Sequence, residues 1–117
     1  MTDGARPNRV AEELREVLAG EIPKLKDPRV GFVTVTAVRV TPDLRRAVVS
    51  YTALGDDAER RATAAGLRSA RARLRSVLGK EVRIKFTPEL VFEEDHTVEE
   101  ASRVDELIAK LHREEAP

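Results

Sequence analysis

Two stretches of alternating side chains, separated by a turn, place the strongest limit on how this chain folds. Residues 32–40 are rich in β-branched side chains, and residues 47–54 repeat the alternation between the two faces of a strand. Between them lies Thr41-Pro42-Asp43, a sequence typical of turns. Because a period of two is the period of a β-strand, the segment is predicted to be a β-hairpin.

The first of these strands changes phase part-way along. Val33, Val35 and Ala37 share one phase of the alternation, whereas Val38 and Val40 share the other. A β-bulge inserts one extra residue and shifts the phase of everything that follows. We therefore expect a bulge near Ala37 and Val38.

Helical periodicity flanks the hairpin on both sides. Before it, apolar residues recur at helical spacing from near Pro7, and Pro23 predicts a kink or an end in the four residues that precede it. After the hairpin, Asp56 and Glu59 match a capping box, which opens a long helical region that is predicted to close at Gly79.

Two further elements complete the predicted order. Residues 82–86 alternate, Pro88 interrupts the pattern and residues 90–92 resume it, which predicts a third strand that the proline breaks or makes an edge. Thr97 and Glu100 form a second capping-box pattern at the start of an amphipathic C-terminal helix. The order is α-β-β-α(-α)-β-α, a mixed α+β chain.

Length and composition limit the organisation further. A chain of 117 residues has room for one core, and with 3% aromatic residues that core must be aliphatic. No repeat or low-complexity linker divides residues 1–117, so we expect one domain, with a core at about 6–95 and an acidic helix at about 97–115. The absence of cysteine excludes disulfides and thiolate sites, and no apolar run predicts a signal peptide or a membrane span. These features predict a cytoplasmic protein.

The formal net charge of zero conceals a strong segregation of charge. Residues 60–85 carry nine basic side chains and one acidic side chain, whereas residues 89–115 carry three basic and ten acidic ones. A local positive field, not the global balance, is what attracts a phosphate backbone. The middle of the chain is therefore the predicted docking site of a polyanion.

A stripe of arginines runs along the long helical region. Arg61, Arg68 and Arg75 lie seven residues apart and share their side of the helix with Arg71, and no acidic residue lies between Arg60 and Lys80. A solvated face would normally carry acidic partners, so their absence favours an external anionic partner. The predicted RNA-binding residues are Arg61, Arg68, Arg71, Arg73, Arg75, Lys80, Arg83 and Lys85, with Arg45, Arg46, Arg6 and Arg9 in second rank.

Signals for catalysis are weak. His96 and His112 lie sixteen residues apart without the spacing of a metal site, and residues 93–96 are better interpreted as a solvated acidic turn before a helix. No phosphate-binding glycine loop and no nucleophile motif is present. We therefore predict that the protein is not an enzyme and uses no cofactor or metal.

Several segments together resemble the ribosome-binding factor A family. They match in order over about residues 6–113. The matching segments are Arg6-Pro7-Asn8-Arg9-Val10, Lys26-Asp27-Pro28-Arg29-Val30-Gly31, residues 48–54, Arg75-Ser76-Val77-Leu78-Gly79-Lys80, and Pro88-Glu89-Leu90-Val91-Phe92 with Asp95.

This resemblance implies a type II KH-like domain, with a three-stranded sheet packed on helices. It also implies a non-enzymatic bacterial assembly factor that acts on the free 30S small ribosomal subunit. Such a factor contacts 16S ribosomal RNA, assists late maturation and 5′-end processing of the precursor, and supports growth in the cold. Ribosomal proteins are further possible partners, and a monomer without membrane contacts is expected.

The family replaces the GxxG loop of ordinary KH domains with a helix kink at an Ala-x-Gly element. The matching residues here are Ala70, Arg71 and Ala72, so the alanine is present and the glycine is not. Alanine favours a continuous helix by about 1 kcal/mol over glycine, which leaves the sharpness of the kink open. The substitution also puts Arg71 at the kink.

Two rival functions remain open. The first is a protein-interaction module whose basic face binds an acidic partner, and the second is a small hydrolase whose site has no sequence motif. A steep dependence of RNA binding on salt would favour the RNA-binding hypothesis over the first rival. The acidic C-terminal helix is hypothesised either to face basic ribosomal proteins or to restrain indiscriminate RNA binding.

Overall fold

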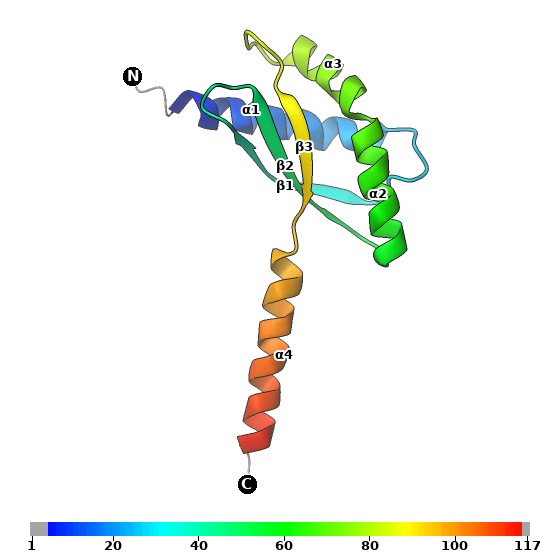
Figure 1. Cartoon of the computed structure of the whole chain (residues 1–117), viewed down its shortest axis with the longest axis vertical. Coiled ribbons are helices and arrows are strands. Elements are labelled where there is room, and N and C mark those ends of the chain that lie inside the picture. The colour runs from blue at the N-terminus through cyan, green and yellow to red at the C-terminus, as the bar shows by residue number, and fades with distance from the viewer. Residues whose placement is uncertain (1–4, 116–117) are drawn as a thin grey trace.

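The computed structural model describes the backbone of residues 5–115 and the side chains of residues 8–97 and 103–114. The predicted order of elements and the α+β class are confirmed (Figure 1). In chain order the elements are α1 (Ala5–Glu21), the 3-10 helix η1 (Ile22–Lys24), β1 (Val33–Val40), β2 (Arg46–Ala53), α2 (Asp57–Ser69), α3 (Arg71–Glu81), β3 (Glu89–Glu94) and α4 (Thr97–Glu115).

The first helix ends where the proline requires it to. Helix α1 stops at Glu21 and Pro23 lies within the one turn of η1, so the predicted end before Pro23 is confirmed. Leu14, Leu18 and Ile22 are buried along one side of this helical segment. Their spacing of four residues is what places them on one face, against the sheet.

The sheet has the strand order β1-β2-β3, with β1 antiparallel and β3 parallel to β2. Val35 pairs with Tyr51 and Ala37 pairs with Ser50, so Thr36 is the extra residue of a β-bulge. The predicted bulge is confirmed in kind but lies one residue earlier than expected. Because of it, the valines on both sides of Thr36 point toward the same core.

The third strand is shorter than the sequence predicted. The pairing of β2 with β3 begins at Arg46 and Glu89, the first residues of the two strands. Residues 82–88 have no strand opposite them, and the backbone turns within them, since the Ile84 N–H donates to Val82 O at 3.1 Å. The prediction of a strand over residues 82–86 was therefore wrong: alternation alone cannot supply a partner for the backbone hydrogen bonds.

The long helical region is two helices. Asp56 accepts a hydrogen bond from the Glu59 N–H at 2.8 Å, and Glu59 accepts one from the Asp56 N–H at 3.2 Å, which confirms the capping box. The region breaks at Ala70 and ends at Glu81, so the predicted end at Gly79 was two residues short. The last turn closes without a left-handed glycine, because the Val82 N–H bonds to Leu78 O.

Helices α1, α2 and α3 share one core with one face of the sheet. The fully buried side chains are aliphatic, as the composition requires, and Thr63 is the buried polar side chain among the described residues. The opposite face of the sheet carries Thr34, Arg39 and Glu93, all of which are exposed. The core members with the largest buried side chains are Leu14, Leu18, Leu67, Leu74, Leu78, Leu90 and Val49.

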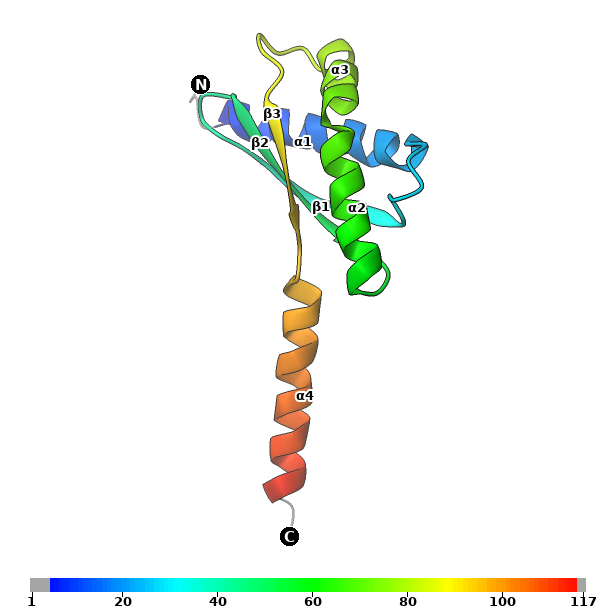
Figure 2. The same cartoon turned by 45° about the vertical axis from the view of Figure 1, so that its right-hand side comes forward.

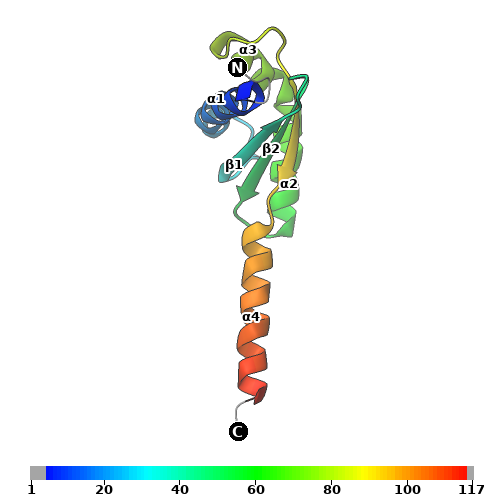
Figure 3. The ribbon, with the colours of Figure 1, turned by 90° about the vertical axis from the view of Figure 1, so that its left-hand side faces the viewer.

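Helix α4 projects away from this body in all three ribbon views (Figures 1, 2 and 3). Its described side chains, residues 103–114, are all exposed. Asp95 forms the joint: one carboxylate oxygen accepts from the Thr97 N–H at 2.9 Å and the other accepts from the Thr36 hydroxyl at 3.1 Å. The predicted helix start at Thr97 is confirmed, whereas the side chain of Glu100 lies outside the described residues.

Candidate nucleic-acid interface

The break between α2 and α3 sits at a single alanine. Ala70 has φ −85° and ψ −3°, and its N–H is shared between the carbonyls at the end of α2. A negative φ of this size is open to any L-residue, so the break needs no glycine. The kink implied at Ala70 and Ala72 is therefore present, with Ala70 as the residue at the break and Ala72 exposed within α3.

The arginine stripe runs along both helices beside the break. Arg61, Arg68, Arg71 and Arg75 are all exposed. On the β3 side of α2, Arg61 lines a shallow hollow together with Tyr51 and Phe92, whose rings meet edge to face with centroids 6.3 Å apart. The stripe thus borders β3, one of the two edge strands of the sheet.

One member of the stripe is engaged by the protein itself. The Arg75 guanidinium donates to Pro88 O at 3.2 Å and to Thr87 O at 3.1 Å. Arg75 therefore ties α3 to the segment that leads into β3. Arg71 makes a more local contact, since its Nε donates to Arg68 O, 3.2 Å away, at the end of α2.

Arg73 and Lys80 are exposed but do not belong to the stripe. Arg73 follows Arg71 by two residues, which turns it about 200° around the helix axis. Lys80 follows Arg73 by seven residues and lies on that same side. These two predicted RNA-binding residues therefore lie on a different side of α3 from the stripe.

Arg83 and Lys85 lie in the loop of residues 82–88, where both are exposed. Arg45 and Arg46 are exposed at the hairpin turn, and the Glu89 N–H donates to Arg45 O at 2.8 Å. The hairpin turn and the end of the loop are therefore neighbours. The structure brings these four residues to the end of the sheet where Arg75 holds the loop.

The two second-rank residues of the first helix stand apart. Arg9 is exposed on α1, which packs against β1, the strand at the opposite edge of the sheet from β3. The side chain of Arg6 lies outside the described residues. Nothing in the described part of the molecule joins Arg9 to the stripe.

Arg60, which the sequence did not single out as a binding residue, anchors α2 to the sheet. Its guanidinium lies 3.1 Å from an Asp57 oxygen and 3.3 Å from a Glu94 oxygen. The second Glu94 oxygen lies 3.6 Å from His96 Nε2. These contacts neutralise Arg60 internally, so it adds little to the field that the stripe presents.

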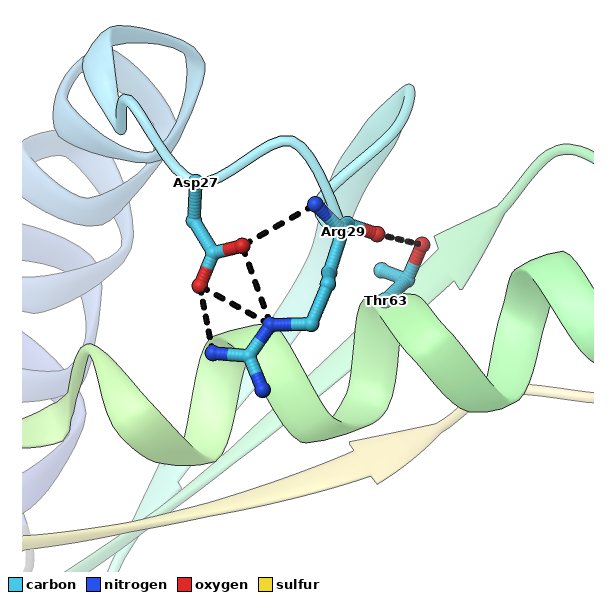
Figure 4. Close-up of polar contacts among 3 residues, drawn as sticks. All are labelled: Asp27, Arg29 and Thr63. Carbon is cyan, nitrogen blue, oxygen red and sulfur yellow. Dashed lines mark hydrogen bonds and ion pairs between the residues drawn. The ribbon is translucent and has the colours of Figure 1, made fainter.

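The loop of residues 26–31 fixes the opposite side of α2 (Figure 4). The Arg29 guanidinium donates to both carboxylate oxygens of Asp27, at 3.0 and 2.6 Å, and holds the pKa of Asp27 at about 2. The buried Thr63 hydroxyl donates to Arg29 O at 3.3 Å and accepts from the Gly31 N–H at 3.3 Å. The hydrogen bonds between Thr63 and the backbone of residues 29 and 31 position α2 against this loop. They do not involve the arginines of the stripe.

The loop of residues 26–31 packs closely against α2 because Gly66 of α2 lacks a side chain. A Cβ at this position would lie 2.6 Å from Val30 Cγ2, which is well inside van der Waals contact. Glycine is therefore required at this point of α2 for the loop to pack.

Sequence reasoning missed two exposed aromatic residues, Phe32 and Phe86, of which Phe86 lies near the basic residues of the candidate interface. Phe86 was assigned to a strand, where burial is the default, but its side chain is 61% exposed, and Lys85 Nζ lies 5.5 Å from its ring centroid. The signal that was available is Pro88, which ends the alternation two residues later.

A metal centre or a membrane span would point to other kinds of function. Among the described residues, no group of three or more His, Cys, Asp or Glu side chains is placed to hold a metal ion. Of the helices in the described part of the chain, none combines the length and the apolar character that a membrane span needs.

Comparisons with known proteins agree with the resemblance found in the sequence. Residues 6–108 match the family model described as ribosome-binding factor A. The chain is 46% identical over 110 residues to the ribosome-binding factor A of Geobacter sulfurreducens, with 93% of each chain covered. It is 44% identical over 117 residues to that of Streptomyces griseus, covering 99% of this chain and 74% of the relative.

Solved structures give the same answer. The crystal structure of ribosome-binding factor A from Thermus thermophilus matches with a TM-score of 0.69 and 31% identity, over 75% of this chain and 93% of that one. A homology model of the Thermus thermophilus protein, fitted into a cryo-electron-microscopy map of its 30S complex, matches with a TM-score of 0.63 and 32% identity, over 73% of this chain and 90% of that one. The type II KH-like fold is thereby confirmed, and the chain belongs to the ribosome-binding factor A family.

Proposed function

We propose that this chain binds the free 30S ribosomal subunit through its 16S ribosomal RNA and assists late maturation of the subunit without catalysing a reaction. The proposal includes 5′-end processing of the precursor RNA, which the bound protein would promote and a nuclease would carry out. The protein would act in the cytoplasm, as a monomer, where free subunits are found.

The observation that carries this proposal is the unneutralised arginine stripe. Arg61, Arg68 and Arg71 are exposed on one side of α2 and α3, and no acidic residue lies between Arg60 and Lys80. Basic side chains arranged in this way contact the phosphates of RNA and release condensed counterions. Such contacts fix position and orientation, and carry little information about base sequence.

The relatives support the same partner. The Thermus thermophilus protein, which shares this fold, was placed in a complex with the 30S subunit. The rival hypothesis, that the basic face binds an acidic protein, predicts instead that RNA alone will not compete for the face. Competition with free RNA therefore separates the two.

The structure improves the choice of variant for testing the stripe. Replacing Arg75 would also release the loop of residues 82–88, so a loss of binding would be ambiguous. Within the described part of the chain, the other three members of the stripe donate no hydrogen bond to a distant segment, so Arg61→Glu, Arg68→Glu and Arg71→Glu are combined. A matched control combines Lys24→Glu, Arg39→Glu and Lys110→Glu, three exposed cations that lie outside α2, α3 and the loop of residues 26–31.

The test is sedimentation of each protein with free small subunits through a sucrose gradient. We expect the unaltered protein and the control to move with the subunits at low salt and to leave them at high salt. The stripe variant should remain at the top while keeping its circular-dichroism spectrum. Co-migration of the stripe variant with the subunits would show that the stripe is only a solvated face.

The role in maturation needs a separate readout. In cells that lack the natural protein, the unaltered chain should lower the amount of 16S precursor with an unprocessed 5′ end, as measured by primer extension. The stripe variant should not. Equal precursor levels with both proteins would remove the maturation role while leaving subunit binding in place.

A further inference from the structure

The loop of residues 82–88 displays an aromatic ring together with two cations. Phe86 is 61% exposed, and its neighbours Arg83 and Lys85 are both exposed as well. The loop contains no acidic residue. An exposed phenylalanine forgoes the free energy that burial of its ring would contribute, so its exposure in a loop with two cations points to contact with a partner.

The loop is anchored at both ends and in the middle. Val82 is 4% exposed and Pro88 is among the fully buried side chains. Ile84 packs against the core, and the Arg75 guanidinium holds the carbonyl oxygens of Thr87 and Pro88. Phe86 is therefore presented to solvent by a segment that the fold holds in place, not by a chain end.

Arg75 also makes the loop continuous with the stripe. Its side chain leaves α3 from the stripe and bonds to Thr87 O and Pro88 O, so an RNA strand that follows the stripe as far as Arg75 reaches the loop next to Phe86. Successive bases of single-stranded nucleic acid stack on exposed aromatic rings, while nearby cations hold the phosphates. The ring and the two cations that precede it in the loop fit this pattern.

We propose that Phe86 is a stacking platform for an unpaired base of RNA, with Arg83 and Lys85 holding the adjacent phosphates. The inference rests on the proposed function and adds a second kind of contact to it, because the stripe alone reads phosphates. It also gives the chemical class of the ligand, a single-stranded or bulged segment in preference to a regular duplex.

The composition of the chain makes a direct test possible. The chain has no tryptophan, so Phe86→Trp introduces a single fluorescent reporter at the proposed platform. The matched control is Phe32→Trp, because Phe32 is 80% exposed and has no basic residue beside it in the chain. Both positions are exposed, so both variants are expected to fold.

The probes are free small subunits, a ten-nucleotide oligoadenylate and a blunt RNA duplex. We expect the subunits and the oligoadenylate to quench the tryptophan at position 86 and to leave the one at position 32 unchanged. The duplex should leave both unchanged. In parallel, Phe86→Ala should weaken binding of oligoadenylate and of subunits about tenfold, Phe86→Tyr should retain it and Phe86→Leu should behave like the alanine variant.

Each outcome is decisive. If subunits bind the Phe86→Trp protein with unchanged fluorescence, the platform is disproved and the proposed function stands. Full binding of subunits by Phe86→Leu, with loss in Phe86→Ala, would assign Phe86 to an apolar protein contact and would also overturn the inference. If the unaltered protein fails to bind subunits at low salt, the proposed function itself fails.

Discussion

Hydrogen bonds from single side chains fix several segments of this molecule relative to one another. Arg29 clamps Asp27, Arg75 joins α3 to the loop of residues 82–88, and Asp95 joins the sheet to α4. All three are charged groups near the surface that bond to a neighbouring part of the chain. Charge alone does not distinguish Arg29 and Arg75 from the exposed arginines of the stripe, so the sequence could not separate anchoring arginines from those proposed to bind RNA.

Lowering the pH should remove the stabilisation that the ion pair between Asp27 and Arg29 provides. The pKa of Asp27 is lowered from 3.8 to about 2, chiefly by hydrogen bonds from Arg29, so the folded state favours the carboxylate. Stability from this group is complete above pH 3.8 and is lost as the pH falls toward 2. We expect Asp27→Asn to lower the thermal midpoint at pH 7 and the difference from the unaltered protein to shrink as the pH approaches 2, measured by calorimetry.

A control on α4 isolates the effect. Glu114→Gln removes a carboxylate that is exposed on α4, and it should leave the thermal midpoint unchanged across the same pH range. A constant difference between Asp27→Asn and the unaltered protein from pH 7 to pH 2 would rule out the clamp as the cause.

Replacing an anchoring arginine and replacing an arginine that bonds to no distant segment should have different effects on the free energy of unfolding. Arg75→Gln removes two hydrogen bonds from a charged group to loop carbonyls and should lower the free energy of unfolding by about 1 kcal/mol, measured by urea titration. Arg68→Gln should change it by less than about 0.5 kcal/mol, because the side chain is exposed and bonds to no distant segment. Equal effects would mean that Arg75 does not hold the loop.

At the scale of elements, signals that act through neighbouring residues were more reliable than the one that depended on the start of a distant strand. The capping box at Asp56 and the turn at Pro42 act through neighbouring residues, and both predictions were confirmed. The strand predicted over residues 82–86 failed, because pairing depends on where β2 begins, about forty residues away.

The packing of α2 against the loop of residues 26–31 gives an element-level test. Gly66→Ala would place a Cβ 2.6 Å from Val30 Cγ2, and overpacking of this kind lowers stability by about 1–3 kcal/mol. The higher helix propensity of alanine, about 1 kcal/mol, offsets only part of this. We therefore expect a net fall in the free energy of unfolding, measured by chemical denaturation.

Gly20 in α1 provides the opposite case. A Cβ there would have no other atom within 4 Å, so Gly20→Ala should raise stability by about 0.5–1 kcal/mol through helix propensity alone. If both alanine variants were stabilising, the loop would have to shift easily, and its proposed part in positioning α2 would fail.

The whole molecule is a body with one long arm. It extends 65 × 42 × 18 Å along its principal axes, and α4 accounts for the long direction (Figures 1 and 3). The amphipathic pattern of residues 97–115 predicted the helix but not that its apolar side chains, such as Leu107 at 59% exposure, would be free of the core. Periodicity shows that an apolar face exists and leaves open what covers it.

Removing α4 should therefore leave the body folded. We expect a chain that ends at residue 96 to keep the thermal midpoint of the full chain to within about 2 °C, because the described side chains of α4 are exposed. Calorimetry of the two proteins at equal concentration measures this. A fall of about 10 °C would mean that α4 packs on the body in solution, and that the body is not an independent unit of about residues 6–95.

The joint at Asp95 has a consequence for how the protein would hold on to a large partner. A 19-residue helix reaches roughly 28 Å, so its far end can touch a second point on the same particle while the stripe stays engaged. The carboxylate bonds both to Thr36 of the sheet and to the first turn of the helix, which limits the angles the arm can sample. A stiff tether keeps the effective concentration of its tip high near one distance and low elsewhere. Avidity would then depend on the distance between the two contact sites on the partner, one for the stripe and one for the tip of α4. The hydrogen bonds of Asp95 would set the distance at which both sites can be occupied together.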